Sequence, residues 1–335
     1  MKSFLRYSLF GIFMILAIIC FFADHDWISY PSFQVIGLLS PYIFVLALLI
    51  GIFYGIRTRY DLMIWFFICV GLTWESIIGL VGVDFQEGFA PNPEYKLKVM
   101  SLNAAQLEYT KDDIQKFADA VALYKADIIC LQEIGIEKNW TNKDSVGFAM
   151  AKAFNMPYFS FSRHPNNIYG LAIFSKIPIN SSEEIFLPIG NMNGAISYHL
   201  TIKSNKNLTI YNIHLQSFNL AEQEDKSFGH LTGIIGEQQE EVQLIRENLE
   251  NKHAMLILGD MNSPPYLHTY KQLSEGFQDG FDKVHFEYGA TLHTWMLPYK
   301  IDVQLYNDYI KCVSYENLAF EYSDHNIQLG VYEIY

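Results

Sequence analysis

Several apolar segments of this 335-residue sequence end in a polar side chain that could bind a metal ion or move a proton. VMSLN ends at Asn103, and IICLQE ends at Glu133. The residues that share this arrangement are Asn103, Glu133, Asn212, His214, Asp260, Asn262, Asp302, Asp324 and His325. A polar residue after a strand is usually a turn or a helix cap, so one such position alone indicates little. The whole set is more informative, because it combines carboxylates, amides and two imidazoles without a cysteine cluster.

The composition of this set favours metal-assisted hydrolysis of a phosphate ester. Carboxylate and amide oxygens are suitable ligands for a hard cation such as Mg²⁺ or Mn²⁺. Amide groups can hold a phosphoryl oxygen, and imidazoles can move protons. A water molecule activated at such a site would attack the phosphorus atom.

The polar residues lie at the ends of segments that we predict to be strands and that alternate with helices. The predicted strands are 96–103, 127–132, 169–175, 196–203, 207–215, 253–260, 300–306, 309–315 and 326–334. Apolar residues at helical spacing predict helices over 112–124 and about 233–251. Continuous apolar runs such as DIICLQ are typical of strands that are covered on both faces. We therefore predict a core of two sheets with helices outside, in one domain over residues 92–335.

The order of the motifs resembles that of the endonuclease/exonuclease/phosphatase superfamily, which includes DNase I-like nucleases, neutral sphingomyelinases and inositol-polyphosphate 5-phosphatases. The matching motifs are S-x-N at Asn103, L-Q-E at Glu133, G-x-x-x-x-S-K from Gly170, H-L at His214, G-D-x-N at Asp260, I-D at Asp302 and S-D-H at Asp324. They follow the family's order between residues 96 and 328. The resemblance implies an α/β fold, a four-layered α/β/β/α sandwich of two packed mixed sheets with the active site at one edge.

The resemblance also implies a site for Mg²⁺, with Mn²⁺ as an alternative. Glu133 resembles the main metal ligand of the family, and Asn103 is expected close to the same cation. Asp324 resembles a second acid near the metal. These are oxygen ligands, which both cations prefer.

Five further residues resemble the catalytic residues of the family. His214 resembles the histidine that protonates or stabilises the leaving oxygen. Asp260 and Asn262 resemble the pair that orients the nucleophile and holds a phosphoryl oxygen, and Asp302 resembles the acid that supports a histidine. His325 resembles a general base or a phosphate-binding imidazole, so the general base is either His325 or Asp260. The sequence identifies no carboxylate partner for His214.

Three apolar segments near the N-terminus have the length of a membrane-spanning helix, about 20 residues. They lie at about 4–23, 33–56 and 62–83. The first could instead be a signal peptide, but it has no A-x-A cleavage site and two further apolar segments follow it. We therefore expect residues 1–91 to anchor the chain in a lipid bilayer through three transmembrane helices.

The positions of Lys and Arg predict the orientation of this anchor. Lys2 and Arg6 lie at the start of the first segment. Arg57 and Arg59 lie in the second loop, whereas the first loop contains neither Lys nor Arg. Because cytoplasmic loops are enriched in Lys and Arg, we expect a cytoplasmic N-terminus and an extracytoplasmic catalytic domain. Glu75, an acid within the third segment, is expected to face the helix bundle.

The charge of the chain limits the choice of substrate. The net charge is −13; four of the 23 basic and six of the 36 acidic residues precede residue 92, which leaves −11 on the rest. So acidic a domain has no broad phosphate-binding field, which argues against tight non-specific binding of nucleic acid. A nuclease that recruits a cation at one cleft is still compatible with this charge. The candidate substrates are nucleic acids, lipid head groups and small phosphate esters, and the sequence indicates no protein partner.

Two alternatives stand beside a nuclease. A sphingomyelinase-like lipid phosphodiesterase would benefit from an anchor that holds its cleft near lipid head groups. A catalytically silent binding domain could keep the same fold, although every polar motif position is intact in this chain. Stabilisation by Mg²⁺ or Mn²⁺ would distinguish a working site from a silent one.

Overall fold

The structure, a computed structural model, describes residues 2–25, 28–82, 95–105, 111–135, 143–188, 192–202, 206–218, 227–250, 252–283, 287–292 and 299–335. Its contacts divide the chain into two units that alternate along the sequence. Unit 1 consists of Met1–Val81, Phe218–Val242 and Ser263–Leu273, and unit 2 consists of Gly82–Ser217, Gln243–Asn262 and Ser274–Tyr335. The predicted domain boundary at residues 91 and 92 lies outside the described residues and stays a prediction.

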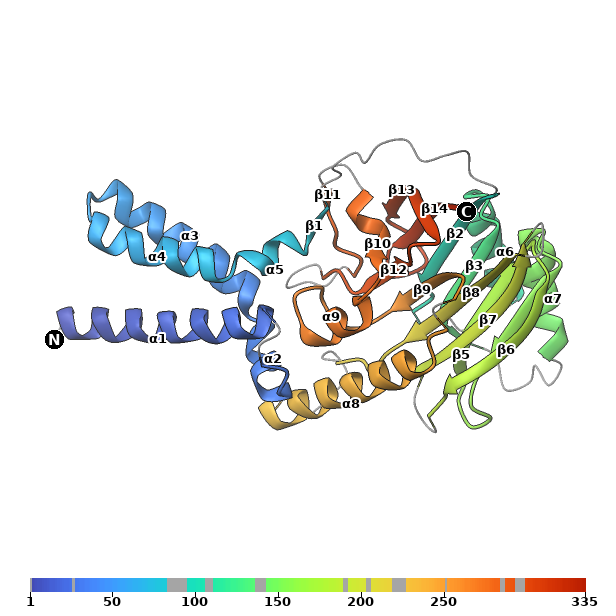
Figure 1. The fold of residues 1–335 in the computed structure, drawn as a ribbon, viewed down its shortest axis with the longest axis horizontal. Coiled ribbons are helices and arrows are strands. Elements are labelled where there is room, and N and C mark those ends of the chain that lie inside the picture. The colour runs from blue at the N-terminus through green and yellow to red at the C-terminus, as the bar shows by residue number, and fades with distance from the viewer. Residues whose placement is uncertain are drawn as a thin grey trace. The chain divides into compact units, whose positions relative to one another are not determined.

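Unit 2 contains two six-stranded sheets (Figure 1). The strand order of the first sheet is β13 (Ile310–Leu318), β14 (Ile327–Ile334), β2 (Tyr95–Asn103), β3 (Ile128–Gly135), β5 (Tyr169–Ser175) and β4 (Tyr158–Ser162). That of the second sheet is β10 (Gln278–Asp279), β12 (Asp302–Tyr306), β9 (Ala254–Asp260), β8 (Lys206–His214), β7 (Gly194–Ile202) and β6 (Ile179–Phe186). β2 pairs with β3, and β8 with β9, in parallel, while the other neighbouring strands of these sheets are antiparallel. Both sheets are therefore mixed.

The core of unit 2 lies between the two sheets. Alternate residues of the central strands belong to it, such as Leu97 and Val99 of β2 and Leu256 and Leu258 of β9, all fully buried. Ile257, between Leu256 and Leu258, and Met100, directly after Val99, are apolar and buried as well, because the outer faces of these strands are also covered. Burial on both faces explains the continuous apolar runs in the sequence.

Two helices cover the outer face of the first sheet (Figure 1). They are α6 (Lys111–Ala122) and α7 (Lys143–Phe154). Phe117 of α6 is fully buried in the same apolar cluster as Met100 of β2. The predicted α/β sandwich of two sheets with helices outside is thereby confirmed.

The end of another helix lies on the outer face of the second sheet. α8 spans Phe228–Glu247, and the hydroxyl of Tyr211 on β8 donates to the carbonyl of Asn248, directly after this helix. The remaining short elements are α9 (His268–Ser274), β1 (Val81–Gly82), β11 (Glu287–Tyr288) and a 3-10 turn at Gly280–Lys283. The hydrogen bond of Tyr211 fixes where the C-terminal end of α8 meets the sheet.

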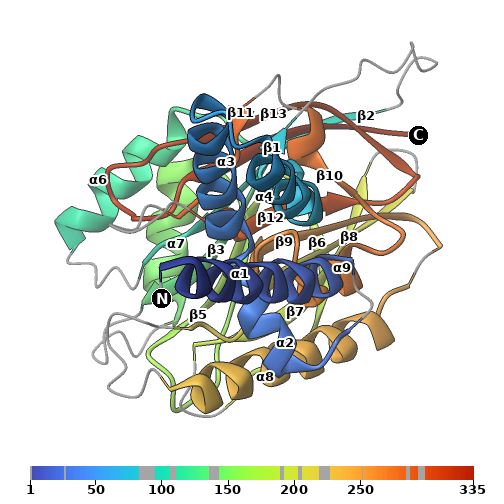
Figure 2. The ribbon, with the colours of Figure 1, turned by 90° about the vertical axis from the view of Figure 1, so that its left-hand side faces the viewer.

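Unit 1 is built mainly from apolar helices. They are α1 (Lys2–Asp24), α2 (Pro31–Gly37), α3 (Ser40–Ile56), α4 (Tyr60–Leu72) and α5 (Trp74–Ile78). α1, α3 and α4 pack side by side, as Figures 1 and 2 show. Ala17, Cys20 and Ala47 are fully buried between them. Small side chains at these positions let the helix backbones approach closely.

A distant segment, Ser263–Leu273, completes unit 1. The N–H of His268 donates to Oε1 of Gln34 at 2.9 Å. Tyr266 is 1% exposed and packs in one apolar cluster with Leu80. Residues separated by more than 180 positions in the sequence therefore form one folded unit.

Glu75 is paired with two basic side chains inside unit 1. Its Oε1 lies 3.0 Å from Nζ of Lys271, and its Oε2 lies 3.0 Å from Nε2 of His25. Lys271 also donates to the backbone carbonyl of Asp24. Glu75 thus has charged partners within the unit, and its side chain is 41% exposed.

Among the described residues, no single helix is both long and apolar enough to cross a bilayer. α2 and α3 meet that condition only as a pair, and they are bent by 41° at the break between them. Phe10–Asp24 and Tyr60–Leu72 are shorter apolar helices. The third predicted span is interrupted at Thr73, whose hydroxyl donates to the carbonyl of Cys69. Three transmembrane helices at 4–23, 33–56 and 62–83 are therefore not supported.

Candidate functional site

The polar strand ends singled out in the sequence meet at one edge of the two sheets. In the second sheet, Asp260 at the end of β9 pairs in register with His214 of β8 and with Asp302 of β12. In the first sheet, Asn103 ends β2 and pairs with Gln132 of β3. Glu133 is the next residue of β3. Parallel β8 and β9 end at the same edge of the second sheet, and antiparallel β12 begins there, so the strand order brings His214, Asp260 and Asp302 together.

Asn103 joins the carboxylates of the two sheets. Its Nδ2 donates to Oδ2 of Asp260 at 2.9 Å and to Oε1 of Glu133 at 3.2 Å. The orientation of the amide is set by its Oδ1, which accepts the N–H of Ala105 at 2.9 Å. Asn103 therefore holds an acid from each sheet next to the other.

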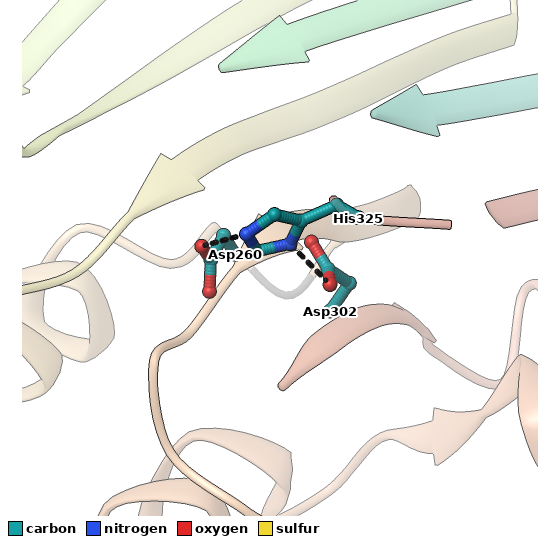
Figure 3. A group of neighbouring side chains, drawn as sticks. All are labelled: Asp260, Asp302 and His325. Carbon is teal, nitrogen blue, oxygen red and sulfur yellow. Dashed lines mark hydrogen bonds and ion pairs between the residues drawn. The ribbon is translucent and has the colours of Figure 1, made fainter. Parts of the chain in front are cut away.

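His325 lies between two acids of the second sheet (Figure 3). Its Nδ1 and Oδ2 of Asp302 are 2.9 Å apart, and its Nε2 and Oδ2 of Asp260 are 3.8 Å apart. Asp260 and Asp302 are each 1% exposed, and His325 is 6% exposed. One ligand atom from each of the three lies within 4.8 Å of the others, which is close enough for a shared cation.

His214 takes its orientation from a backbone carbonyl. Its Nδ1 lies 3.2 Å from the carbonyl oxygen of Met192, so Nδ1 carries the proton. Its Nε2 then faces Oε1 of Glu133 at 3.3 Å and Oδ2 of Asp260 at 3.8 Å. The sequence identified no carboxylate partner for His214; the structure places a main-chain oxygen at Nδ1, which leaves no signal in the sequence, and carboxylates at Nε2. Two carboxylates around a bare ring nitrogen require a proton or a cation between them.

We refer to Asn103, Glu133, His214, Asp260, Asp302 and His325 as the Asp260 cluster. Asn262 lies beside it and is held by two bonds. Its N–H donates to Oδ1 of Asp260 at 2.7 Å, and its Nδ2 donates to the carbonyl of Leu215 at 3.0 Å. Asn262 thus anchors the chain directly after the acid of the G-D-x-N motif.

The structure does not bring Asp324 into the cluster, because the turn before β14 directs its side chain to solvent. Oγ of Ser323 donates to the carbonyl of Asn103 at 2.7 Å and accepts the N–H of His325 at 3.0 Å. This turn points His325 inward and leaves Asp324 exposed between them. Ser323 belongs to the S-D-H motif, and the structure adds that it fixes the turn.

Asn212 lies behind the site rather than in it. Its Oδ1 accepts from Nε2 of Gln132 at 2.7 Å, and its Nδ2 donates to the carbonyls of Leu131 and Ala172, each at 3.1 Å. These bonds connect the two sheets in the fully buried interior. Asn212 therefore fixes the distance between the sheets that carry the cluster.

Glu133 and Asn262 adopt a backbone conformation that side-chain-bearing residues rarely adopt. Their φ angles are 50° and 49°. At Glu133, a register shift interrupts the pairing of β3 with β5, and such a bulge redirects a side chain. Each conformation of this kind costs about 1–3 kcal/mol, and it persists where surrounding contacts impose it, often at functional sites.

Burial and neighbouring charges determine the ionisation of the cluster. The pKa of Asp260 is raised to about 6, first by burial and then by the charge of Asp302, against the opposite effects of His325 and His214. Burial alone would lower the pKa of His325, but the charge of Asp302, its hydrogen bond and the charge of Asp260 raise it to about 10. His325 is therefore an imidazolium at neutral pH while no cation offsets the acids.

The cluster fits a hard divalent cation. Its acids supply oxygen ligands, and buried carboxylates this close together need positive charge to offset their own. Glu133 is the more accessible acid, with a side chain 12% exposed against 2% for Asp260 and Asp302. Glu133 is thus the acid of the cluster that solvent reaches most easily.

Comparisons with known proteins concern the domain and the fold that carry this cluster. A model of the endonuclease/exonuclease/phosphatase family matches residues 100–325, and no curated protein matches the sequence. The catalytic domain of human Nocturnin with bound sulfate has a TM-score of 0.54 at 18% identity, covering 75% of this chain and 98% of that one. An endonuclease/exonuclease/phosphatase from Beutenbergia cavernae has a TM-score of 0.54 at 14% identity, covering 71% of this chain and 72% of that one. Truncated TDP2 from Caenorhabditis elegans has a TM-score of 0.52 at 15% identity, covering 72% of this chain and 98% of that one.

Proposed function

Since the chain belongs to the endonuclease/exonuclease/phosphatase family, we propose that it hydrolyses phosphate esters at the Asp260 cluster with a divalent cation. Members of this family are generally metal-dependent phosphoesterases. The observation that carries the proposal is the bridge of Asn103 between acids of both sheets, at the edge where two imidazoles also lie. The reaction class is attack of water on a phosphodiester or phosphomonoester.

Glu133 is the main ligand of the cation in this proposal, with Mg²⁺ first and Mn²⁺ as the alternative. A bound cation would polarise a phosphoryl oxygen and offset its charge. Asn103 holds Glu133 against Asp260, so both acids face one position. The exposed Asp324 contributes charge rather than a ligand.

The other cluster residues handle protons and the phosphoryl group. Asp260, with a pKa of about 6, is ionised at neutral pH and accepts the proton of the attacking water. His325, protonated and held by Asp302, donates a hydrogen bond to a phosphoryl oxygen. His214, with Nδ1 fixed by a backbone carbonyl, presents Nε2 to the leaving oxygen.

We also propose that lipid covers the apolar helices of unit 1. Large apolar side chains on α1, α3 and α4 are exposed, among them Ile15 at 59%, Leu49 at 60% and Trp65 at 47%. Exposed apolar surface of this extent is typical of a membrane contact. The arrangement we propose is multi-pass, with a cytoplasmic N-terminus and the catalytic unit outside the cytoplasm. Flotation with liposomes and protease protection of sealed vesicles test it: a chain that stays with the unbound fraction contradicts the proposal.

The substrate class is open to a direct test. The acidic net charge disfavours long polyanions, whereas a membrane-bound chain would lie near lipid phosphates. The panel is plasmid DNA, RNA, sphingomyelin, an inositol phosphate and a bis-aryl phosphodiester. Full-length chain and its His325→Ala variant are each assayed with Mg²⁺ or with EDTA.

Turnover that requires both Mg²⁺ and His325 is the expected result. Preference for DNA or RNA would identify a nuclease, and preference for sphingomyelin would identify a lipid phosphodiesterase. No turnover on any substrate, together with no stabilisation by Mg²⁺ or Mn²⁺, would contradict the hydrolase and favour the silent binding domain.

A further inference from the structure

Thr291 lies outside the Asp260 cluster, but its hydrogen bonds link the backbone of Asp302 to the backbone next to His325. It is 1% exposed and lies on the short segment that precedes β12. Its Oγ1 accepts the N–H groups of Ile301 and Asp302, each at 3.0 Å. Its hydroxyl also donates to the carbonyl of Tyr299 at 3.4 Å.

The main chain of Thr291 contacts the segment that carries His325. The carbonyl of Thr291 accepts the N–H of Asn326, the residue after His325, at 2.7 Å. The next residue, Leu292, forms a β-bridge with His325. The side chain of Thr291 therefore fixes the backbone of Asp302, and its main chain fixes the backbone next to His325.

We propose that Thr291 is a positioning residue that sets the Asp302–His325 hydrogen bond, an inference that rests on the proposed hydrolase function. That bond, 2.9 Å between Oδ2 and Nδ1, joins two segments that are 23 positions apart. Without the hydroxyl, two buried N–H groups at the start of β12 lose their acceptor. The backbone of Asp302 then shifts toward another hydrogen-bond acceptor, and the carboxylate of Asp302 moves with it.

The reaction is sensitive to such a shift. A misplacement of about 1 Å in a catalytic group can reduce the rate about 10²-fold. Ile301 further transmits the shift, because its carbonyl accepts the N–H of Met261, next to Asp260. Thr291 thus controls the imidazole that faces the phosphoryl group without contacting the substrate.

The test compares Thr291→Val, which removes the hydroxyl and keeps the shape, with Thr291→Ser, which keeps the hydroxyl. Thr209→Val is the matched control. Thr209 is fully buried on β8, in the second sheet, to which β12 also belongs. Its hydroxyl contacts His199 and His253 outside the cluster. The full-length variants are assayed for kcat and KM on the preferred substrate.

A second readout does not depend on activity. The proton on Nδ1 of His325 in its hydrogen bond to Asp302 gives a downfield proton NMR signal, which His325→Gln assigns by removing it. Wild type, Thr291→Val, Thr291→Ser and Thr209→Val are compared. If Thr291→Val does not fold, Thr291→Ala replaces it, because the smaller side chain leaves room for water at the two N–H groups.

We expect Thr291→Val to lower kcat about 10- to 100-fold with KM within about twofold, and to shift or abolish the NMR signal. Thr291→Ser should stay within about threefold of wild type in kcat, as should Thr209→Val. A Thr291→Val or Thr291→Ala variant with the wild-type NMR signal overturns the proposal, as does a loss of kcat no greater than that of Thr209→Val. If the wild type turns over no substrate, the proposed function fails, and the NMR comparison still decides the role of Thr291.

Discussion

The imidazole of His325 is placed between Asp302 and Asp260, and the two contacts differ in kind. Nδ1 makes a hydrogen bond to Asp302, whereas Nε2 stands 3.8 Å from Asp260 and is left for another partner. A buried acid behind a histidine fixes the tautomer and stabilises the protonated ring. The residue types were visible in the I-D and S-D-H motifs, but their pairing required the three-dimensional structure.

Asp302→Asn should reduce kcat about 10²-fold or more, because His325 loses the charge that orients and protonates it. Asp324→Asn, which removes the same charge from an exposed side chain, should change kcat less than about threefold. Steady-state kinetics of the two variants on one substrate checks this. Equal losses would favour the role that the family resemblance implied for Asp324 over its exposed position.

The stability of the metal-free chain should fall as the pH rises. The folded-state pKa of His325, about 10, lies above its ordinary value of 6.5, so the folded chain binds this proton more tightly than the unfolded chain. The resulting stabilisation is fully present below pH 6.5 and is lost as the pH rises toward 10. Melting temperatures in EDTA across this range measure the effect. His325→Gln should flatten the dependence; a slope equal to that of the wild type would contradict this assignment.

At the scale of strands and helices, the sequence predicted most of the elements that carry the site. The strands that end at Asn103 and Asp260 lie where the apolar runs placed them, because those runs are buried on both faces. β6, Ile179–Phe186, was not predicted, because this edge strand is polar and largely exposed. The positive φ of Glu133 was not predictable either, since no glycine marks it and the bulge depends on pairing with β5.

Close contact between β8 and β9 is required to bring His214 next to Asp260, and Gly259 permits it. Its φ is +134°, and an added Cβ would lie 2.0 Å from the carbonyl oxygen of Ile213. Gly259→Ala should therefore lower the free energy of unfolding by about 3 kcal/mol or more. Gly233→Ala, where a Cβ on α8 meets nothing within 4 Å, should raise it by about 0.5–1 kcal/mol. Chemical denaturation measures both, and a tolerated Gly259→Ala would contradict the close approach.

At the scale of the molecule, contacts group the chain into two units whose segments alternate along the sequence, while the expected order of anchor and catalytic domain stays a prediction. A hydropathy pattern averages residues that are adjacent in the sequence, so it could not show that Ser263–Leu273 folds with the N-terminal helices. This segment directly follows Asn262 of the G-D-x-N motif. The chain therefore passes from the candidate site straight into unit 1.

Residues 92–335 should be unstable when produced alone. The deletion uncovers Tyr266 and Leu267, each 1% exposed in the full chain, and burial of such a side chain is worth about 1.5–3 kcal/mol. The fragment should melt at least about 5 °C below the full-length chain or aggregate. Differential scanning calorimetry and size-exclusion chromatography test this. A monodisperse fragment with the melting temperature of the full chain would show that unit 1 does not need its N-terminal helices.

The central claim is that the Asp260 cluster binds a divalent cation through Glu133, and a Mn²⁺ titration of the full-length chain followed by thermal unfolding tests it most directly. Wild type is compared with Glu133→Gln, which keeps the size of the side chain, and with Glu183→Gln on the exposed face of β6. At a concentration 100 times Kd, Mn²⁺ should raise the free energy of unfolding of wild type and Glu183→Gln by about 2.7 kcal/mol. Glu133→Gln should lose most of this gain. No stabilisation of the wild type, or the same stabilisation in Glu133→Gln, would contradict the claim.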